Sequence, residues 1–231
     1  MSISTHRTRI KICGLTRSED VQAAVAAGAD ALGFVFYPRS PRYVAPETAA
    51  VLMTAIPPFV TAVGLFVNAT PQEVMDVVAQ TPLALLQFHG DETPQRCCAI
   101  AAAVNRPFVR AIRVGATTRS ADLLKYEQDY RAAGGLFTGL LLDALVDGYG
   151  GGGKVFDWSL VPKELAPRVV LSGGLSAQNA TDAVVRVRPF AVDVSSGVEL
   201  AKGIKDAAKI RAFIEAVRLA DASPSRVLGT E

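Results

Sequence analysis

A single cysteine stands at the end of the first alternating apolar segment, in the stretch RIKICGLT at residues 9–16. Lys11 precedes Cys13 by two residues, so on a strand both side chains lie on one face, roughly 7 Å apart. A free thiol has a pKa of about 8.5 and exchanges protons near neutral pH, as a general base must. A nearby cation favours the thiolate. A buried structural cysteine would explain the thiol alone, but it would not explain the lysine.

Other polar side chains also follow short apolar segments. Gln87 and His89 lie in LLQFHG, Asp143 follows three leucines, and Asp193 lies in AVDVSSG. Because Asp143 emerges from an apolar segment, we expect burial to raise its pKa and keep a protonated fraction available as an acid. A strand-end aspartate commonly caps the next helix, but the loop after Asp143 is rich in glycine and begins no helix.

These side chains need a scaffold, and the chain alternates short aliphatic segments with helical patterns. The aliphatic segments predict strands at 8–13, 31–36, 60–67, 84–88, 108–113, 138–143, 168–172 and 190–194. The helical patterns predict helices at 18–27, 71–80, 176–187 and 205–220, with a short helix near 158–164. Two boundaries have clear end signals: Gly28 follows the first helix, and Thr70 with Pro71 begins the second.

Alternating strands and helices favour a parallel sheet, because parallel strands need long crossover connections. Eight such units predict an α/β protein with a single (β/α)8 barrel, a fold of about 250 residues. A doubly wound sheet is the alternative, but its glycine fingerprint is missing after the first strand. We expect a barrel domain over 1–222 and a C-terminal tail over 223–231.

The last two predicted strands end in small residues before a helical segment, where barrels of this kind often bind phosphate. Glycine lets backbone N–H groups approach an anion, and a helix N-terminus adds a favourable dipole. Tight turns would explain either loop alone, but two such loops at consecutive strand ends favour an anion site. The candidate phosphate ligands are Gly173, Gly174, Ser195, Ser196 and Gly197, with Gly152 and Gly153 closing a third side.

Composition and charge limit the kinds of partner and cellular compartment that suit this chain. A net charge of +2 gives no electrostatic case for nucleic acid or a membrane surface. The longest apolar runs are too short to cross a bilayer, and the N-terminus lacks the apolar segment of a secretory signal. The three cysteines are spaced for neither a disulfide framework nor a zinc site. We therefore expect a cytoplasmic protein without metal or membrane, and a monomer or weak homodimer.

Across nearly the whole chain, to about residue 218, the sequence resembles the phosphoribosylanthranilate isomerase family of tryptophan biosynthesis. The similar stretches are KICGLT (11–16), GADALGFVFYPRSPRYV (28–44), GLFVN (64–68), LLQFHGDE (85–92), LLLDA (140–144), GGGGKVFDW (150–158), LSGGLSAQN (171–179) and DVSSGVE (193–199). Two departures stand out. Phe88 replaces a usual leucine, and the glycine loop lacks a threonine whose hydroxyl would contact phosphate.

The resemblance implies an Amadori rearrangement of a phosphorylated aminoaldose to an aminoketose, which needs two proton transfers and no cofactor. It implies that Cys13 is the general base and Asp143 the general acid. It also implies that the planar guanidinium of Arg42 binds the anthranilate carboxylate. His89 would line the pocket, although a histidine satisfied in the core or at the rim explains it nearly as well.

Barrel closure yields one expectation of its own. The eighth strand must pair with the first, so Lys11 and Asp193 would both point into the lumen. We expect them to form an ion pair beneath the active site, since each charge alone would be costly to bury. Both are candidate substrate-binding residues, and Asp193 would reach a ribose hydroxyl.

Two other functions fit the same glycine loops. Another phosphosugar barrel enzyme, such as a histidine-pathway isomerase or indole-glycerol-phosphate synthase, would carry other catalytic groups. The former is expected to place aspartates after strands one and five, where this chain has Cys13 and Arg113. A barrel that only binds a phosphometabolite would keep the loops without needing both Cys13 and Asp143.

Overall fold

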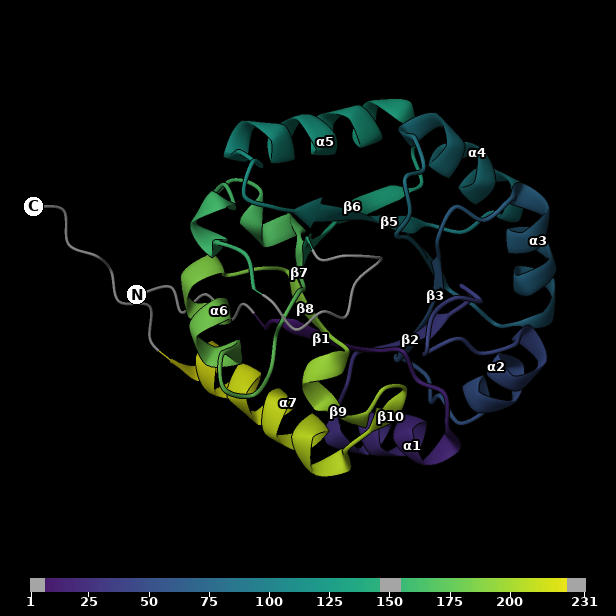
Figure 1. Cartoon of the computed structure of the whole chain (residues 1–231), viewed down its shortest axis with the longest axis horizontal. Helices are drawn as coiled ribbons and strands as arrows, with labels where there is room; N and C mark the ends of the chain where they lie inside the picture. The colour runs from purple at the N-terminus through teal and green to yellow at the C-terminus, as the bar shows by residue number, and fades with distance from the viewer. Residues whose placement is uncertain (1–6, 146–154, 224–231) are drawn as a thin grey trace, which may run out of the picture.

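The computed structural model of the chain describes residues 7–145 and 155–223. Eight parallel strands close into a barrel in chain order, and helices surround it (Figure 1). The strands are β1 (Arg9–Cys13), β2 (Ala31–Val35), β3 (Thr61–Phe66), β4 (Leu85–Phe88), β5 (Phe108–Val114), β6 (Phe137–Ala144), β7 (Val170–Leu171) and β8 (Ala191–Val194). The helices are α1 (Ser18–Ala27), α2 (Pro46–Met53), α3 (Pro71–Gln80), α4 (Pro94–Val104), α5 (Ser120–Ala133), α6 (Ala180–Val187) and α7 (Ala207–Ala222). The predicted (β/α)8 barrel is confirmed.

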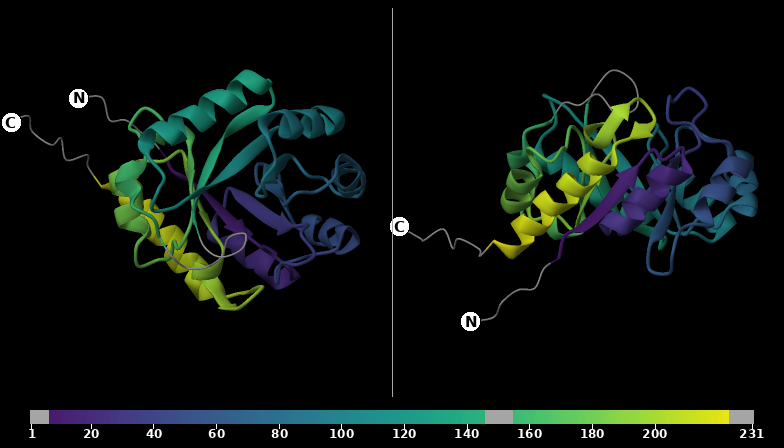
Figure 2. Two further views of the ribbon diagram at one scale, coloured as in Figure 1. Left: turned by 45° about the horizontal axis from the view of Figure 1, so that its top comes forward. Right: turned by 90° about the horizontal axis from the view of Figure 1, so that it is seen from below.

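Five short elements complete the described chain. They are the 3-10 helices η1 (Trp158–Leu160), η2 (Ala166–Arg168) and η3 (Ser196–Val198), and the antiparallel hairpin of β9 (Glu199–Ala201) and β10 (Ile204–Lys205). The hairpin lies at the rim of the barrel, near the beginning of α7 (Figure 2). Its two strands contribute the charged side chains of Glu199 and Lys205 near the pocket.

Local sequence signals explain where two helices begin or end. The N–H of Gly28 bonds to Ala24 and Val25 at the end of α1, and Gly28 has the left-handed φ of 91° that glycine adopts without strain. Thr70 and Glu73 form a reciprocal capping box at the start of α3, with Pro71 in its first turn. Both predicted boundaries are confirmed.

The main core lies between the strands and the surrounding helices. Phe88, the departure from the family pattern, belongs to this core rather than to the lumen and is 1% exposed. Its ring packs between Phe66 and Phe108, with centroid distances of 6.5 and 5.4 Å. A bulky aromatic at this position therefore fills space behind the barrel and leaves the pocket side of β4 unchanged.

Several predicted boundaries are wrong for local reasons. The strand expected over 168–172 contains only two residues, and α6 begins at Ala180 instead of residue 176. The side chain of Asn179 explains the late start, because it accepts from the N–H of Ser176 and donates to the carbonyl of Gly174. Within the range 158–164, where a short helix was expected, only the 3-10 helix η1 forms, and η2 follows at Ala166–Arg168.

The last helix begins at Ala207, after β10, whereas the sequence predicted a start at 205. It ends at Ala222, next to the predicted boundary between the barrel and the tail. The division into 1–222 and 223–231 stays a prediction, because both ends of the chain lie outside the described residues. None of the helices in the described ranges is long and apolar enough to cross a bilayer.

Candidate functional site

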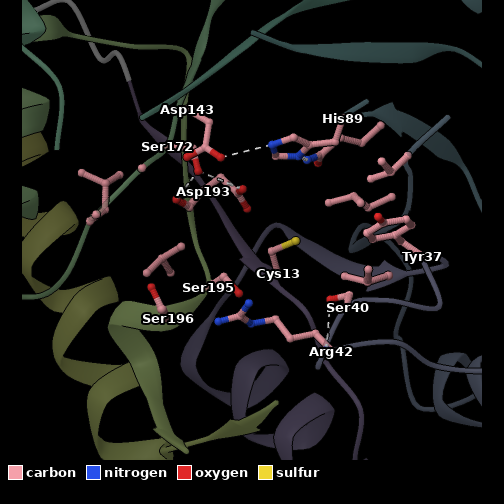
Figure 3. Close-up of a pocket in the computed structure, with 18 residues that line it drawn as sticks. Cys13, Tyr37, Ser40, Arg42, His89, Asp143, Ser172, Asp193, Ser195 and Ser196 are labelled. Atoms are coloured by element: carbon pink, nitrogen blue, oxygen red, sulfur yellow. Dashed lines mark hydrogen bonds and ion pairs between the residues drawn. The ribbon is translucent and has the colours of Figure 1, made fainter. Parts of the chain in front are cut away.

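The carboxyl ends of the strands surround one pocket, where barrel enzymes carry their chemistry. It encloses about 630 Å³ of space, part of it open to solvent, and is shown in Figure 3. The side chains come from most of the strands and from the loops that follow them. Those named in the sequence analysis that line it are Cys13, Arg42, Gln87, His89, Asp143, Gly173, Gly174, Asp193, Ser195 and Ser196.

The thiol and the carboxyl group predicted to exchange protons line the same pocket. Cys13 ends β1, Asp143 lies near the end of β6, and each residue is 5% exposed. Figure 3 shows the Cys13 sulfur below the Asp143 carboxyl, with Asp193 between them on one side and His89 on the other. A ligand in this space can meet an acid and a base at once.

Burial governs the protonation of Cys13. It raises the pKa of the thiol, while the positive charge of Lys11 lowers it by a smaller amount. The negative charge of Asp193 also raises the pKa of the thiol. The expectation that Lys11 favours the thiolate is therefore correct in sign, but burial outweighs it, and the net shift opposes ionisation.

Gly33 is a site residue that the sequence analysis missed. It pairs with Cys13 across β1 and β2, and a Cβ added there would stand 2.8 Å from the Cys13 sulfur and 3.1 Å from Cε of Lys11. Only glycine leaves room for both side chains. The signal was present in GADALGF, but the need for a glycine depends on the register between two strands.

A chain of hydrogen bonds joins β4 to Asp143. Nε2 of Gln87 donates to Nδ1 of His89 at 3.0 Å, so the imidazole carries its proton on Nε2 and donates it to Asp143 at 3.1 Å. All three side chains are buried. His89 is thus the immediate partner of the candidate acid, a closer association than the lining position expected from sequence.

The predicted ion pair in the lumen is confirmed. Nζ of Lys11 lies 2.8 Å from Oδ1 of Asp193, directly across the β1–β8 seam, and Ser172 donates to Oδ2 at 3.2 Å. Burial disfavours the charged ammonium, yet the charges and hydrogen bonds of Asp193 and Cys13 together outweigh it, so the pKa of Lys11 is raised. Asp193 lines the pocket, whereas Lys11 does not. Direct substrate binding by Lys11 stays a prediction.

The two small-residue loops lie side by side in the pocket wall. Gly173 and Gly174 have left-handed φ values of 84° and 64°, which glycine adopts without strain. Gly197 does not line the pocket. A Cβ there would overlap the carbonyl oxygen of Leu175, so this glycine lets the two loops pack together. Its role as a phosphate ligand stays a prediction. Gly152 and Gly153 lie outside the described residues.

The structure places Arg42 in the pocket wall with one edge of its guanidinium already bound. Nε and Nη2 lie 2.7 and 2.8 Å from the two carboxylate oxygens of Glu199 in β9. Lys205 of β10 contacts the same carboxylate at 2.9 Å. The sequence analysis missed both partners: Glu199 ends the DVSSGVE motif without a recognised role, and Lys205 was placed at the start of the last helix.

In the described part of the chain, no cluster of three or more histidine, cysteine or acidic side chains could hold a metal ion. What the pocket offers is an acid, a base, a guanidinium and two glycine-containing loops. Such a set can move protons on a small molecule that carries anionic groups at both ends.

Comparison with known proteins decides the family. The sequence model of N-(5'phosphoribosyl)anthranilate (PRA) isomerase matches residues 10–216, which is most of the chain. The chain belongs to this family. Among its named relatives, the N-(5'-phosphoribosyl)anthranilate isomerase of Herminiimonas arsenicoxydans is 74% identical over 223 residues, covering 96% of this chain and 98% of that protein. That of Methylibium petroleiphilum is 62% identical over 216 residues, covering 94% and 96%.

Solved structures of the isomerase family have the same fold. The Thermotoga maritima phosphoribosyl anthranilate isomerase superposes with a TM-score of 0.79 at 43% identity, covering 91% of this chain and 98% of that chain. Another structure of the family, at 41% identity with a TM-score of 0.76 and the same coverage, is a complex with reduced 1-(o-carboxyphenylamino)-1-deoxyribulose 5-phosphate.

Proposed function

We propose that this chain catalyses the Amadori rearrangement of N-(5-phosphoribosyl)anthranilate to 1-(2-carboxyphenylamino)-1-deoxyribulose 5-phosphate, a step of tryptophan biosynthesis. The observation that carries the proposal is one pocket lined by both the Cys13 thiol and the Asp143 carboxyl. Membership of the isomerase family supports the choice of substrate.

The first step opens the ribose ring. Asp143 in its protonated form gives its proton to the ring oxygen, and the bond between that oxygen and C1 breaks. The lone pair of the anthranilate nitrogen moves into a C1–N double bond, which yields a Schiff base. The hydrogen bond from His89 holds the Asp143 carboxyl in place for this transfer.

The second step moves hydrogen from C2 to C1. Cys13, as thiolate, removes the proton on C2, and the electrons of that bond form a C1–C2 double bond while the Schiff-base nitrogen becomes neutral. The resulting enolamine gains a proton at C1 and loses the proton of its C2 hydroxyl. The product is the ketone, with no net oxidation and no need for a cofactor.

Three groups of residues anchor the substrate in this proposal. Arg42 binds the anthranilate carboxylate through the guanidinium edge that Glu199 does not occupy. The loops at Gly173–Gly174 and Ser195–Ser196 bind the phosphate, together with Gly152 and Gly153. Asp193 accepts a hydrogen bond from a ribose hydroxyl, while Lys11 holds Asp193 from below.

The test is turnover of N-(5-phosphoribosyl)anthranilate by the wild type and by Cys13→Ser and Asp143→Asn. Each substitution should lower kcat by about 10²–10⁴, the range of general acid–base groups. Near-full activity in either variant would remove that residue from the mechanism. An inactive wild type that still binds phosphorylated ligands would favour a binding protein instead.

The same proposal extends to the protein's state in the cell. We propose a cytoplasmic enzyme that binds a phosphorylated small molecule, does not bind nucleic acid, and is a monomer or weak homodimer. All three cysteines are free, which supports a reducing compartment. The Thermotoga maritima relative is described as dimeric, and one of its solved structures is of mutually generated monomers, so both states are known for that protein. Sedimentation between micromolar and millimolar concentration tests the association, and a dimer at every dilution contradicts it.

A further inference from the structure

Glu199 binds one defined edge of the Arg42 guanidinium. A guanidinium carries five N–H groups and can bind a carboxylate bidentately either through Nε with Nη2 or through its two terminal nitrogens. Glu199 takes the first edge, with both bonds shorter than 3 Å. The edge formed by the two terminal nitrogens remains for a second carboxylate. The pair is well buried, with 12% of the Arg42 side chain and 6% of the Glu199 side chain exposed.

Lys205 holds Glu199 and the phosphate loop together. Its ammonium donates to Glu199 at 2.9 Å, to the carbonyl of Ser195 at 3.1 Å and to the hydroxyl of Ser195 at 3.3 Å. These contacts use all three donors of an ammonium group. The Lys205 side chain is fully buried, so water does not compete for them. One side chain thus links the partner of Arg42 to a residue of the pocket wall.

The charges of this cluster leave Arg42 attractive to an anion. An arginine paired with a single carboxylate would have its charge cancelled. Here two cations share one carboxylate, so Arg42, Glu199 and Lys205 carry one net positive charge together. Arg42 and Lys205 outweigh the cost of burying the Glu199 carboxylate and lower its pKa, which keeps it ionised.

The hairpin that carries both residues is anchored to the beginning of α1. Gly203 at its turn donates its N–H to Glu199 at 3.2 Å and accepts from the hydroxyl of Thr16 at 2.6 Å. The N–H of Lys205 bonds to Asp20 at 3.1 Å. A hairpin held at its turn and at β10 can fix side-chain positions more firmly than a free loop.

We propose that Glu199 and Lys205 are positioning residues that together set the orientation of Arg42 and its spacing from Ser195, and so match the pocket to a substrate with a carboxylate at one end and a phosphate at the other. The inference rests on the proposed function, in which Arg42 meets the anthranilate carboxylate. Neither residue touches the reacting atoms, so both act on binding more than on chemistry.

The test compares two ligands by calorimetry. One is reduced 1-(o-carboxyphenylamino)-1-deoxyribulose 5-phosphate, and the other is the same compound without its carboxylate. Glu199→Gln should lower the affinity ratio between the two ligands about 10-fold or more, because a charge-assisted hydrogen bond is lost. It should change the affinity for the second ligand less than threefold. Lys205→Met should weaken the binding of both ligands, since it also removes the hydrogen bonds from Lys205 to Ser195.

The matched control is Glu127→Gln, because Glu127 is also mostly buried and also binds two arginines, Arg131 and Arg168, outside the pocket. It should leave the ratio unchanged. Glu199→Asp keeps the negative charge but moves the carboxylate by about one bond length. This variant replaces Glu199→Gln in the test if Glu199→Gln fails to fold. It should reduce the ratio and raise KM while changing kcat little.

An unchanged ratio in folded Glu199→Gln overturns the positioning role. The proposed function is tested separately by the wild type. A wild type that does not distinguish the two ligands refutes the role of Arg42 and with it this inference. A wild type that distinguishes them and turns over substrate, while the Glu199 variants do so equally well, refutes the inference alone.

Discussion

At the scale of single residues, the protonation of Cys13 makes a first prediction. The net effect of burial is to raise the pKa of this thiol above the ordinary value of about 8.5. Below its pKa the thiolate fraction falls tenfold for each pH unit. We therefore expect most of the Cys13 thiolate in the free enzyme to form only above about pH 8.5.

The measurement is the thiolate absorbance near 240 nm between pH 6 and 10, and Cys13→Ser is the control that should lose the step assigned to this thiol. A step that is already complete at pH 7 would contradict a base with a raised pKa.

Gly33 supports a second prediction at this scale. In Gly33→Ala the new Cβ would crowd the Cys13 sulfur, and the thiol must shift to make room. A displacement of this size costs about 10²-fold in kcat, since proton transfer depends on geometry, and overpacking costs about 1–3 kcal/mol of stability.

Gly64→Ala is the matched control, because its Cβ would crowd only Leu83 and Phe66 in the core. It should lose stability to a similar degree and keep its turnover. Equal losses of turnover in the two variants, measured in the same assay, would mean that Gly33 matters only for packing.

At the scale of elements, the contact between the two small-residue loops makes the third prediction. Gly197 lets the loop after β8 pack on the carbonyl of Leu175 in the loop after β7. Gly197→Ala should push them apart and weaken inhibition by inorganic phosphate about 10-fold, because the phosphate loops would no longer converge on one anion. The inhibition constant for phosphate is the measurement.

Gly135→Ala serves as the control here, since nothing lies within 4 Å of its added Cβ. It should leave both phosphate inhibition and turnover as in the wild type. If Gly197→Ala binds phosphate normally, the two loops do not share the anion.

Elements also differ in how far their sequence determines them. Short aliphatic segments, which alternate with helical patterns along the chain, predicted all eight strands of the barrel. This works because strands buried in a parallel sheet consist mostly of continuous aliphatic residues. The hairpin of β9 and β10 was missed, since it is five residues of strand held by the side chains of Thr16, Asp20 and Lys205. Such short elements depend on tertiary contacts more than on periodicity.

The same distinction applies to the pocket. Cys13, His89 and Asp143 could be placed because strand ends in a barrel meet at one rim. Glu199 and Gly33 could not, because their importance arises from contacts with Arg42 and Cys13 that only the folded chain creates. The packing role of Gly197 emerged only from the distance between two loops.

At the scale of the whole molecule, the Lys11–Asp193 pair joins the first strand to the last where the barrel closes. Both side chains are at least nine-tenths buried, so each needs the other as counter-ion. Asp193→Ala leaves an unpaired ammonium in the lumen and should cost about 3–5 kcal/mol of stability. It should also lower turnover, because Asp193 lines the pocket in which we propose the substrate binds.

The double variant Lys11→Met/Asp193→Leu separates these two effects. Two apolar side chains of similar volume remove both buried charges, so stability should return to within about 1–2 kcal/mol of the wild type, while turnover stays low. Denaturant unfolding gives the first quantity and the isomerase assay the second. Recovery of both would show that the pair only closes the barrel. Asp193→Ala with wild-type stability would show that closure does not depend on the pair, and that the hydrogen bonds between β1 and β8 are sufficient to join the two ends of the sheet.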